Sequence, residues 1–458
     1  MRKPTVLYIT WAYRPTHTAG AIRAVNFVDA LIESGLRVIT LTVGHQESIE
    51  RVSDGLTVYS VTENGQIPSE IDSSALPYWP GWKPIPGPDP VARSFRAVFR
   101  TAHGLIRQYE PGVLFATAPP FSSLVAGSQL AEQYNLPQIL EFRDAWFTGM
   151  PWPYKNVIQR LGAKYWERRC VLSANRIITV TNAYRRILID TYGPDVEKKT
   201  FTIRHGYDSR MQDDRQALPQ IQPLSRQKNP FVITHTGQFQ GFDVTSPQTF
   251  RRAWRSMRQG IARIVLGATS CNQLRLDWLC PYNLMAAVAK AAAENPQFRQ
   301  KYRLIFAGQK FDQIDQWAQQ MNLEHVHQFG PLPSPQARQI ARQSDLLVLM
   351  LYGIKNCDYH WCVPSKIYDY LSTGKPVLAL LPPGEAGDLV TQAGTAFPAP
   401  PEDISAIAQQ LISLFKTQQS GGILRKPNWE FIKQFDLRLQ QKQFAEVFLS
   451  VLGQSYRF

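Results

Sequence analysis

Three polar residues, Ser365, Lys366 and Asp369, stand close together in the stretch 362–381, which ends in an apolar run. A helix N-terminus with a lysine in its first turn offers free N–H groups and positive charge, which suit a phosphate. A carboxylate one turn later could accept hydrogen bonds from the two hydroxyls of a ribose. The spacing also fits a solvated helix in which Lys366 and Asp369 only pair with each other, and it leaves this alternative open.

The flanking residues predict the helix that would hold this group. Pro364 is suited to a first helical position and Gly374 to a helix end, so we expect about three turns between them. At 3.6 residues per turn, the three polar side chains share one face. Ile367, Tyr370 and Leu371 then turn toward a sheet.

Arg143 and Asp144 form a second candidate group, directly after the apolar run 138–142. They fall at the carboxyl end of a predicted strand, where α/β folds commonly place catalytic groups. Asp144 could take or orient the proton of a hydroxyl, and Arg143 could offset the charge of a leaving group. His17 competes for the role of base. Alternatively, Arg143 and Asp144 form a salt bridge that holds the loop ending in Trp146.

Continuous apolar runs bounded by turn residues recur between amphipathic segments in both halves of the chain. Runs of this kind are typical of buried parallel strands. They predict an α/β protein with two doubly wound Rossmann-like domains. The runs lie at 5–10, 37–43, 112–117, 138–142, 176–181 and 201–204, then at 231–237, 302–308, 325–330, 345–351 and 376–381.

A polar stretch without periodicity separates the two sets of strands, which predicts the domain boundaries. The last part carries aromatic and leucine residues at helical spacing. It either packs on the second domain alone or crosses back and ties it to the first. The predicted parts are an N-terminal domain (1–204), a linker (205–230), a C-terminal domain (231–427, with an insertion at about 242–284) and a helical segment (428–458).

Composition and charge narrow the class of protein. With 458 residues, 44% hydrophobic and 19% charged, the chain matches an ordinary globular protein of about two domains. Five cysteines without a C-x-x-C spacing favour a reducing, cytoplasmic compartment. The formal charge of +14 favours an acidic partner, but no nucleic-acid-binding module is recognisable, so we expect none to bind.

Several motifs in order along the chain resemble one family. IRHGYD (203–208), ITHTGQF (233–239), LIFAGQ (304–309), VHQFGPLPSPQARQIARQSDLLVLM (326–350) and VPSKIYDYLSTGKPVLAL (363–380) resemble the carboxyl domain of GT-B glycosyltransferases, especially family 4, the glycosyl transferases group 1. FRDAW (142–146) and ITVTNAYRRIL (178–188) resemble the first domain of bacterial polysaccharide glycosyltransferases. The resemblance covers nearly the whole chain apart from about residues 242–284.

The resemblance implies two Rossmann-like domains facing a central cleft that binds a nucleotide-diphosphate sugar. It implies no cofactor and no metal. In the second domain, Asp369 matches a glutamate that binds ribose in the family, and Lys366 and Ser365 would face the phosphates. The glycines of the motifs would allow close approach to the donor, and the backbone near Leu332 would flank the base. These glycines are Gly20, Gly237, Gly308 and Gly330; Gly20 and Gly330 could equally serve plain strand-to-helix turns.

Two positions depart from the family pattern. Asp369 is one methylene shorter than the family glutamate. Many members carry another glutamate eight residues earlier, where this chain has Trp361. Trp361 could instead stack on a sugar, or Asp358 and His360 could supply polar groups from the same loop.

Two further segments are candidates for acceptor or membrane contact. The proline-rich stretch 76–90 contains Trp79 and Trp82, which either stack on a sugar or lipid surface or fold on each other. Residues 251–275 hold only basic charges, either as a solvated helix or as a patch for anionic lipid. No apolar stretch is long enough to span a bilayer, so any membrane contact would be peripheral, at the inner face of the plasma membrane.

Together these features predict a glycosyltransferase that moves a sugar from a nucleotide-diphosphate donor onto a glycan or lipid-linked acceptor, in cell-envelope or exopolysaccharide biosynthesis. Two alternatives stay open. One is a nucleotide-sugar 2-epimerase on the same scaffold. The other is a binding subunit without catalysis, which the departures at Trp361 and Asp369 would suit.

Overall fold

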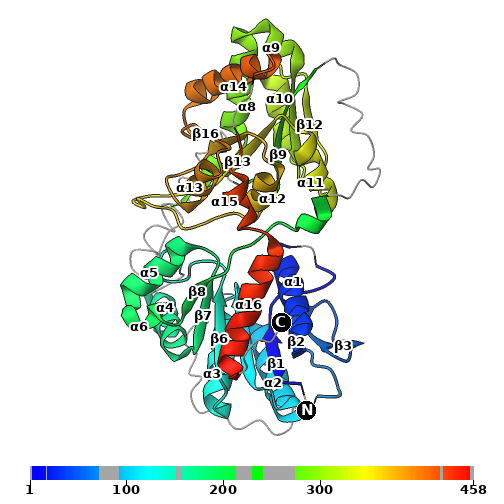
Figure 1. Ribbon diagram of the computed structural model, residues 1–458, viewed down its shortest axis with the longest axis vertical. Helices are drawn as coiled ribbons and strands as arrows, with labels where there is room; N and C mark the ends of the chain where they lie inside the picture. The colour runs from blue at the N-terminus through cyan, green and yellow to red at the C-terminus, as the bar shows by residue number, and fades with distance from the viewer. Residues whose placement is uncertain are drawn as a thin grey trace, which may run out of the picture. The chain divides into compact units, whose positions relative to one another are not determined.

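Apolar strands form the centre of two parallel sheets, as the sequence predicts, in the computed structural model of the chain. The structure describes residues 3–16, 18–71, 92–150, 154, 157–212, 229–240, 274–422 and 426–453. These divide into a first unit, up to His205 and again from Arg438 onward, and a second unit, Gly206 to Leu437 (Figure 1).

The first unit contains an eight-stranded sheet in the order β3-β4-β2-β1-β5-β6-β7-β8, parallel except for the β3–β4 pair. Its first strand is central, and the chain winds outward on one side before returning to the other, so the sheet is doubly wound. Its elements are β1 (Thr5–Ile9), α1 (Ala19–Glu33), β2 (Arg37–Gly44), β3 (Ser48–Ser53), β4 (Leu56–Thr62), α2 (Ala92–Tyr109), β5 (Val113–Ala118), α3 (Ser122–Tyr134), β6 (Gln138–Phe142), α4 (Val157–Ser173), β7 (Arg176–Thr179), α5 (Asn182–Tyr192), α6 (Pro194–Glu197), β8 (Thr200–Thr202) and α16 (Leu437–Leu452).

The second unit contains a six-stranded parallel sheet in the order β12-β11-β9-β13-β15-β16. The strand order reverses between β9 and β13, which is the topological switch point of this sheet. Its elements are η1 (Ser209–Gln212), β9 (Phe231–Thr236), β10 (Leu274–Arg275), η5 (Leu276–Leu279), α8 (Tyr282–Glu294), α9 (Pro296–Lys301), β11 (Tyr302–Ala307), α10 (Asp312–Gln320), β12 (Val326–Gln328), α11 (Ser334–Gln343), β13 (Leu346–Met350), β14 (Gly353–Ile354), α12 (Lys366–Thr373), β15 (Val377–Leu380), α13 (Glu385–Gln392), β16 (Ala396–Pro398), α14 (Ile404–Gln419) and α15 (Trp429–Lys433).

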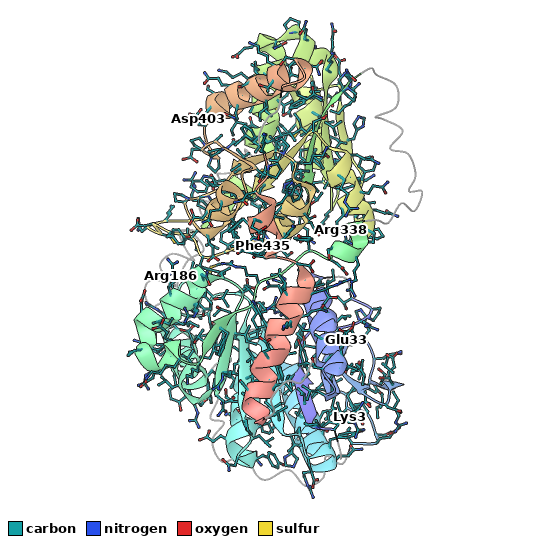
Figure 2. The ribbon with its side chains drawn as sticks, viewed as in Figure 1. Lys3, Glu33, Arg186, Arg338, Asp403 and Phe435 are labelled. Carbon is teal, nitrogen blue, oxygen red and sulfur yellow. The ribbon has the colours of Figure 1, made fainter. Side chains whose placement is uncertain are left out.

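The C-terminal segment is shared by the two units. Phe435, which follows α15 and is labelled in Figure 2, packs against Tyr368 in the second unit, with ring centroids 5.4 Å apart. The next helix, α16, lies along the first unit, where the ring of Phe444 stacks on Phe27 at 4.1 Å (Figure 1). Gln440 Oε1 also accepts the Arg204 N–H at 2.8 Å. Of the two alternatives from the sequence, the helix that crosses back is therefore the one that forms.

Among the described residues, no helix is long and apolar enough to cross a bilayer.

Candidate active site

The loop after β9 forms the floor of the candidate donor site. Gly237 ends this strand with a φ of +113°, a backbone conformation that favours glycine. A methyl group on Gly237 would stand 2.7 Å from Lys366 Nζ, so the bare backbone makes room for the ammonium. Gly308 closes on the same turn, because its own added methyl would overlap the Gly237 carbonyl at 1.8 Å. Gly237 and Gly308, both predicted from the motifs, thus allow Lys366 and the backbone of this turn to approach closely.

His235, on β9, lies within hydrogen-bond distance of Lys366. Its Nδ1 lies 2.9 Å from the Val348 carbonyl on β13, which makes Nδ1 the protonated nitrogen because a carbonyl only accepts. Nε2 is then free to accept a hydrogen bond from Lys366 Nζ, 3.2 Å away. Burial, and after it the Lys366 charge, holds the pKa of His235 well below its usual range. The imidazole is therefore neutral and fixes the position of the ammonium at the switch point.

Lys366 does not pair with Asp369, contrary to the solvated-helix alternative. Among the described residues no carboxylate forms an ion pair with Lys366, and Asp369 instead faces Arg338 of α11 at 3.9 Å. Burial lowers the pKa of Lys366 to about 7. Burial also raises the pKa of Asp369 to about 6, although Arg338 and Arg342 oppose the rise. Both charges are thus poorly compensated in the free protein, as suits groups that bind a polar ligand.

The helix α12 is shorter than predicted but has the predicted faces. It runs over eight residues with Ser365 at its N-cap, one residue after Pro364, and Gly374 ends it in the left-handed conformation. Ser365 makes no side-chain capping bond, so its hydroxyl is left for other partners. The inward face is anchored by the Tyr370 hydroxyl, which accepts the Thr236 N–H at 2.8 Å.

Gly330 and Leu332 lie on the loop after β12. Gly330 has a φ of +79°, and the side chain of Lys310 covers it. Leu332 is partly buried against the cluster around Ile340. The chain at this point is a turn with an apolar floor, compatible with the flank of a planar base.

The sequence suggested that Trp361 could stack on a sugar, but in the structure its ring is too deeply buried to do so. Its side chain is only 2% exposed, and its ring lies against His360. His360 is also buried, its pKa falls to about 4, and its Nδ1 accepts the Cys362 N–H at 3.1 Å. Asp358 is exposed. The prediction for Trp361 was wrong because a residue in a loop was expected to be exposed, whereas this one belongs to the core.

In the first unit, Arg143 and Asp144 do not form a salt bridge. Arg143 Nε and Nη2 donate to the backbone carbonyls of Ala118 and Pro119 at 3.1 and 2.6 Å. Its guanidinium lies against Gly20, where a methyl would stand 1.8 Å from Nη1. Gly20 therefore makes room for Arg143, a neighbour that the sequence did not predict.

Asp144 does not share the partners of Arg143. No hydrogen bond or ion pair joins its carboxylate to any described residue, and the side chain is partly buried. Burial raises the pKa of Asp144, and Arg143 partly offsets the rise. A carboxylate with a raised pKa and a free hydrogen-bonding capacity can accept a proton.

Glu167 supports the loop of Asp144, and sequence reasoning missed it. This buried side chain of α4 accepts the Thr148 N–H at 3.0 Å and the Tyr192 hydroxyl at 2.6 Å, and it also bonds the Thr148 hydroxyl. Thr148 lies four residues after Asp144 in the same loop. A single glutamate within an amphipathic helix has no pattern that would reveal this role.

Sequence reasoning also missed a buried ion pair in the first unit. Arg23 on α1 donates to Glu141 on β6 at 2.8 Å, and Glu141 accepts the Thr117 hydroxyl at 2.6 Å. Arg23 further donates to the carbonyls of Ile203 and Arg204, just before the boundary of the units. It ties the first unit's helix to the last residues before that boundary.

Three predicted site residues, His17, Trp79 and Trp82, lie outside the described residues, as does most of the arginine-rich insertion. Within the described ranges, no group of three or more His, Cys, Asp or Glu is arranged to hold a metal.

Two family models match the chain. Residues 20–210 match Glycosyltransferase Family 4, and residues 267–417 match Glycosyl transferases group 1. The chain belongs to the GT-B glycosyltransferases. This glycosyltransferase matches no curated protein sequence significantly.

Solved structures share the fold of this glycosyltransferase. The HepE protein of Anabaena, in complex with UDP and glucose, is 16% identical, with a TM-score of 0.57 over 97% of this chain and 99% of that one. A trehalose 6-phosphate synthase from Burkholderia multivorans is 12% identical, with a TM-score of 0.60 over 99% of each chain. A UDP-N-acetylglucosamine 2-epimerase from Listeria monocytogenes, named as putative, is 11% identical, with a TM-score of 0.56 over 100% and 98%. At these identities the likeness establishes the fold alone, which agrees with the family.

Proposed function

We propose that this glycosyltransferase takes its sugar from a nucleoside diphosphate sugar bound by the second unit. The observation that carries the proposal is the ammonium of Lys366, held by His235 over the bare backbone of Gly237 without a carboxylate partner among the described residues. A cation set at the switch point of a parallel sheet, beside a helix N-terminus, suits a diphosphate. The HepE structures of Anabaena with UDP and with UDP-glucose support this class of donor.

Each part of the donor has a counterpart in the second unit. The diphosphate meets Lys366, the Ser365 hydroxyl and the first N–H groups of α12. Asp369, one turn along, accepts hydrogen bonds from the ribose hydroxyls. The turn at Gly330 and Leu332 flanks the base.

The chemistry divides between the two units. Lys366 and the helix N-terminus offset the charge that develops on the departing diphosphate, because cations and N–H dipoles stabilise an anion most where charge grows. Asp144 accepts the proton of the acceptor hydroxyl or orients that hydroxyl. Arg143, whose guanidinium bonds two backbone carbonyls, shapes the loop, and its charge offsets that of the leaving group.

The acceptor is a glycan or a lipid-linked sugar of the cell envelope or of an exopolysaccharide, used at the cytoplasmic face of the membrane. The formal charge of +14 supports an acidic acceptor or surface.

The 2-epimerase is the second candidate, since structures of such enzymes share the fold. Both matching family models describe glycosyl transfer, so transfer is favoured.

A panel of nucleotide sugars, incubated with the purified full-length protein, tests the proposal. Donor hydrolysis or transfer that yields free nucleoside diphosphate supports transfer. Conversion to the epimeric sugar without release of diphosphate supports the epimerase instead. Binding without turnover, even with lipid-linked and glycan acceptors, would identify a binding subunit and refute the proposal.

A further inference from the structure

The outer face of α4 is apolar and exposed. Eleven large hydrophobic side chains are exposed over the described part of the chain, and five of them belong to this one helix. Their exposed fractions range from 42% to 60%. We call this set the α4 stripe: Val157, Ile158, Leu161, Tyr165 and Leu172.

Four members of the α4 stripe lie together from Val157 to Tyr165, and Leu172 lies on the same face about two turns further on, beyond Arg168. At about 100° per residue, its five members fall within an arc of about 100°. The opposite face packs into the first unit through Ala163, Trp166 and Cys170, which are buried. One helix thus buries an apolar face and exposes another. Contiguous exposed apolar surface of this kind marks an interaction site.

Three exposed cations accompany the α4 stripe: two lie on one border, and the third, Arg168, falls within its arc between Tyr165 and Leu172. Arg160, Lys164 and Arg168 are exposed at i, i+4 and i+8, and no carboxylate in the described ranges pairs with them. Arg169, on the other border, pairs with Glu132 and donates to the Tyr165 hydroxyl at 2.9 Å. The one acidic residue of α4, Glu167, is buried.

We propose that the outer face of α4 binds the headgroup region of an anionic lipid bilayer, with the α4 stripe inserted at the acyl boundary. Apolar residues on an exposed face, with basic residues beside them and no exposed acid on the helix itself, are what an interfacial helix requires. A second copy of this chain fits the surface less well. A symmetric pair would set the same three cations against themselves.

The inner face of α4 connects this surface to the chemistry. Glu167 holds Thr148 in the loop that carries Asp144. A bilayer bound to the outer face would therefore lie against the helix that positions the candidate base. This consequence rests on the proposed function, whereas binding of the bilayer does not.

Co-sedimentation of the full-length protein with vesicles tests the proposal. The vesicles contain phosphatidylcholine alone or together with phosphatidylglycerol. We expect binding to the anionic vesicles, weakened by added salt. Ile158→Ser with Leu161→Ser should lower the apparent partition coefficient about tenfold or more, because two aliphatic side chains no longer leave water. Arg160→Gln with Lys164→Gln should lower it by a similar factor and reduce the salt dependence.

Matched controls come from other exposed positions of the first unit. Val52→Ser, on β3, removes an apolar side chain that is 43% exposed. Arg96→Gln with Arg100→Gln removes two exposed cations at i and i+4 of α2. Both controls should bind the vesicles within about twofold of the wild type. The melting temperature of each variant verifies that it is folded.

Three results would overturn the proposal: no binding to anionic vesicles at low ionic strength, equal binding by the α4 variants and the wild type, or a solution dimer that the α4 variants convert to monomer. The last would assign the stripe to a second copy. Donor turnover without vesicles is measured on the same samples. If turnover is absent while the vesicle results hold, the proposed function fails and the membrane surface stands. If turnover is present and vesicle binding is absent, the reverse applies.

Discussion

Lys366 and Asp369 titrate close to neutral pH, and this couples donor binding to protons. The pKa of Lys366 is lowered to about 7, so the lysine loses its charge above that pH. The pKa of Asp369 is raised to about 6, so the carboxylate gains a proton below that pH. Each group binds the donor in its charged form. Both side chains are therefore charged only in a narrow pH range, between about 6 and 7.

The affinity for a nucleotide sugar should therefore pass through a maximum between about pH 6 and pH 7. It should fall by up to about tenfold per pH unit on either side. Titration calorimetry at a series of pH values measures it. A nucleotide sugar is the suitable ligand because its phosphodiester groups do not titrate in this range. Lys366→Met should abolish the alkaline limb and Asp369→Asn the acid limb, and an alkaline limb that persists in Lys366→Met would contradict the assignment.

Asp144 should govern turnover and not donor affinity. A group that moves a proton acts mainly in the transition state, so Asp144→Asn should lower the rate constant by about 100-fold to 10,000-fold at nearly constant donor affinity. Because burial already disfavours the charged form, the neutral amide should leave the melting temperature unchanged or slightly higher. Steady-state kinetics with donor and acceptor, beside a melting curve, tests both. A rate within a few-fold of the wild type, combined with a lower melting temperature, would show that Asp144 only braces its loop.

Helix α16 lies near the C-terminal end of the sequence, but it packs on the first unit and stabilises it. Phe444 is fully buried between Phe27 and Phe115, whereas Leu439 on the same helix is 45% exposed. Phe444→Ala leaves a cavity and should cost about 3 to 5 kcal/mol of unfolding free energy. Leu439→Ala should cost less than about 1 kcal/mol. Thermal unfolding of the two variants side by side provides the comparison, and similar melting temperatures would show that α16 does not dock on the first unit as described.

Strands and helices were predictable where burial imposes a simple period. The runs predicted at 138–142 and 231–237 form β6 and β9, since strands covered on both faces are apolar throughout. The hairpin of β3 and β4 was missed because the edge strand β3 is polar and exposed. The α4 stripe was also missed, because a helix with apolar residues on two faces has no clear polar side from which to read its orientation.

Only the part of the candidate site that lies on one helix could be predicted from the sequence. Ser365, Lys366 and Asp369 act from one helix, so their spacing was enough to group them. Arg143 was paired with its neighbour Asp144 by proximity, but it bonds backbone carbonyls 24 and 25 residues away. His235 was overlooked because its role depends on Val348 and Lys366, more than 110 residues distant. Contacts of this range leave no mark on local sequence.

In the whole molecule, we expect the second unit to bind the nucleotide sugar through Lys366. Calorimetric titration of the nucleotide sugar selected by the panel, at pH 6.5, measures this directly in the wild type, in Lys366→Met and in a surface control, Lys290→Met on α8. Loss of a charged hydrogen bond to phosphate costs about 1.5 to 3 kcal/mol, so Lys366→Met should bind about 10-fold to 100-fold more weakly. The control should bind like the wild type. Equal affinity for the donor in Lys366→Met and Lys290→Met, with both variants folded, would show that Lys366 does not bind the donor.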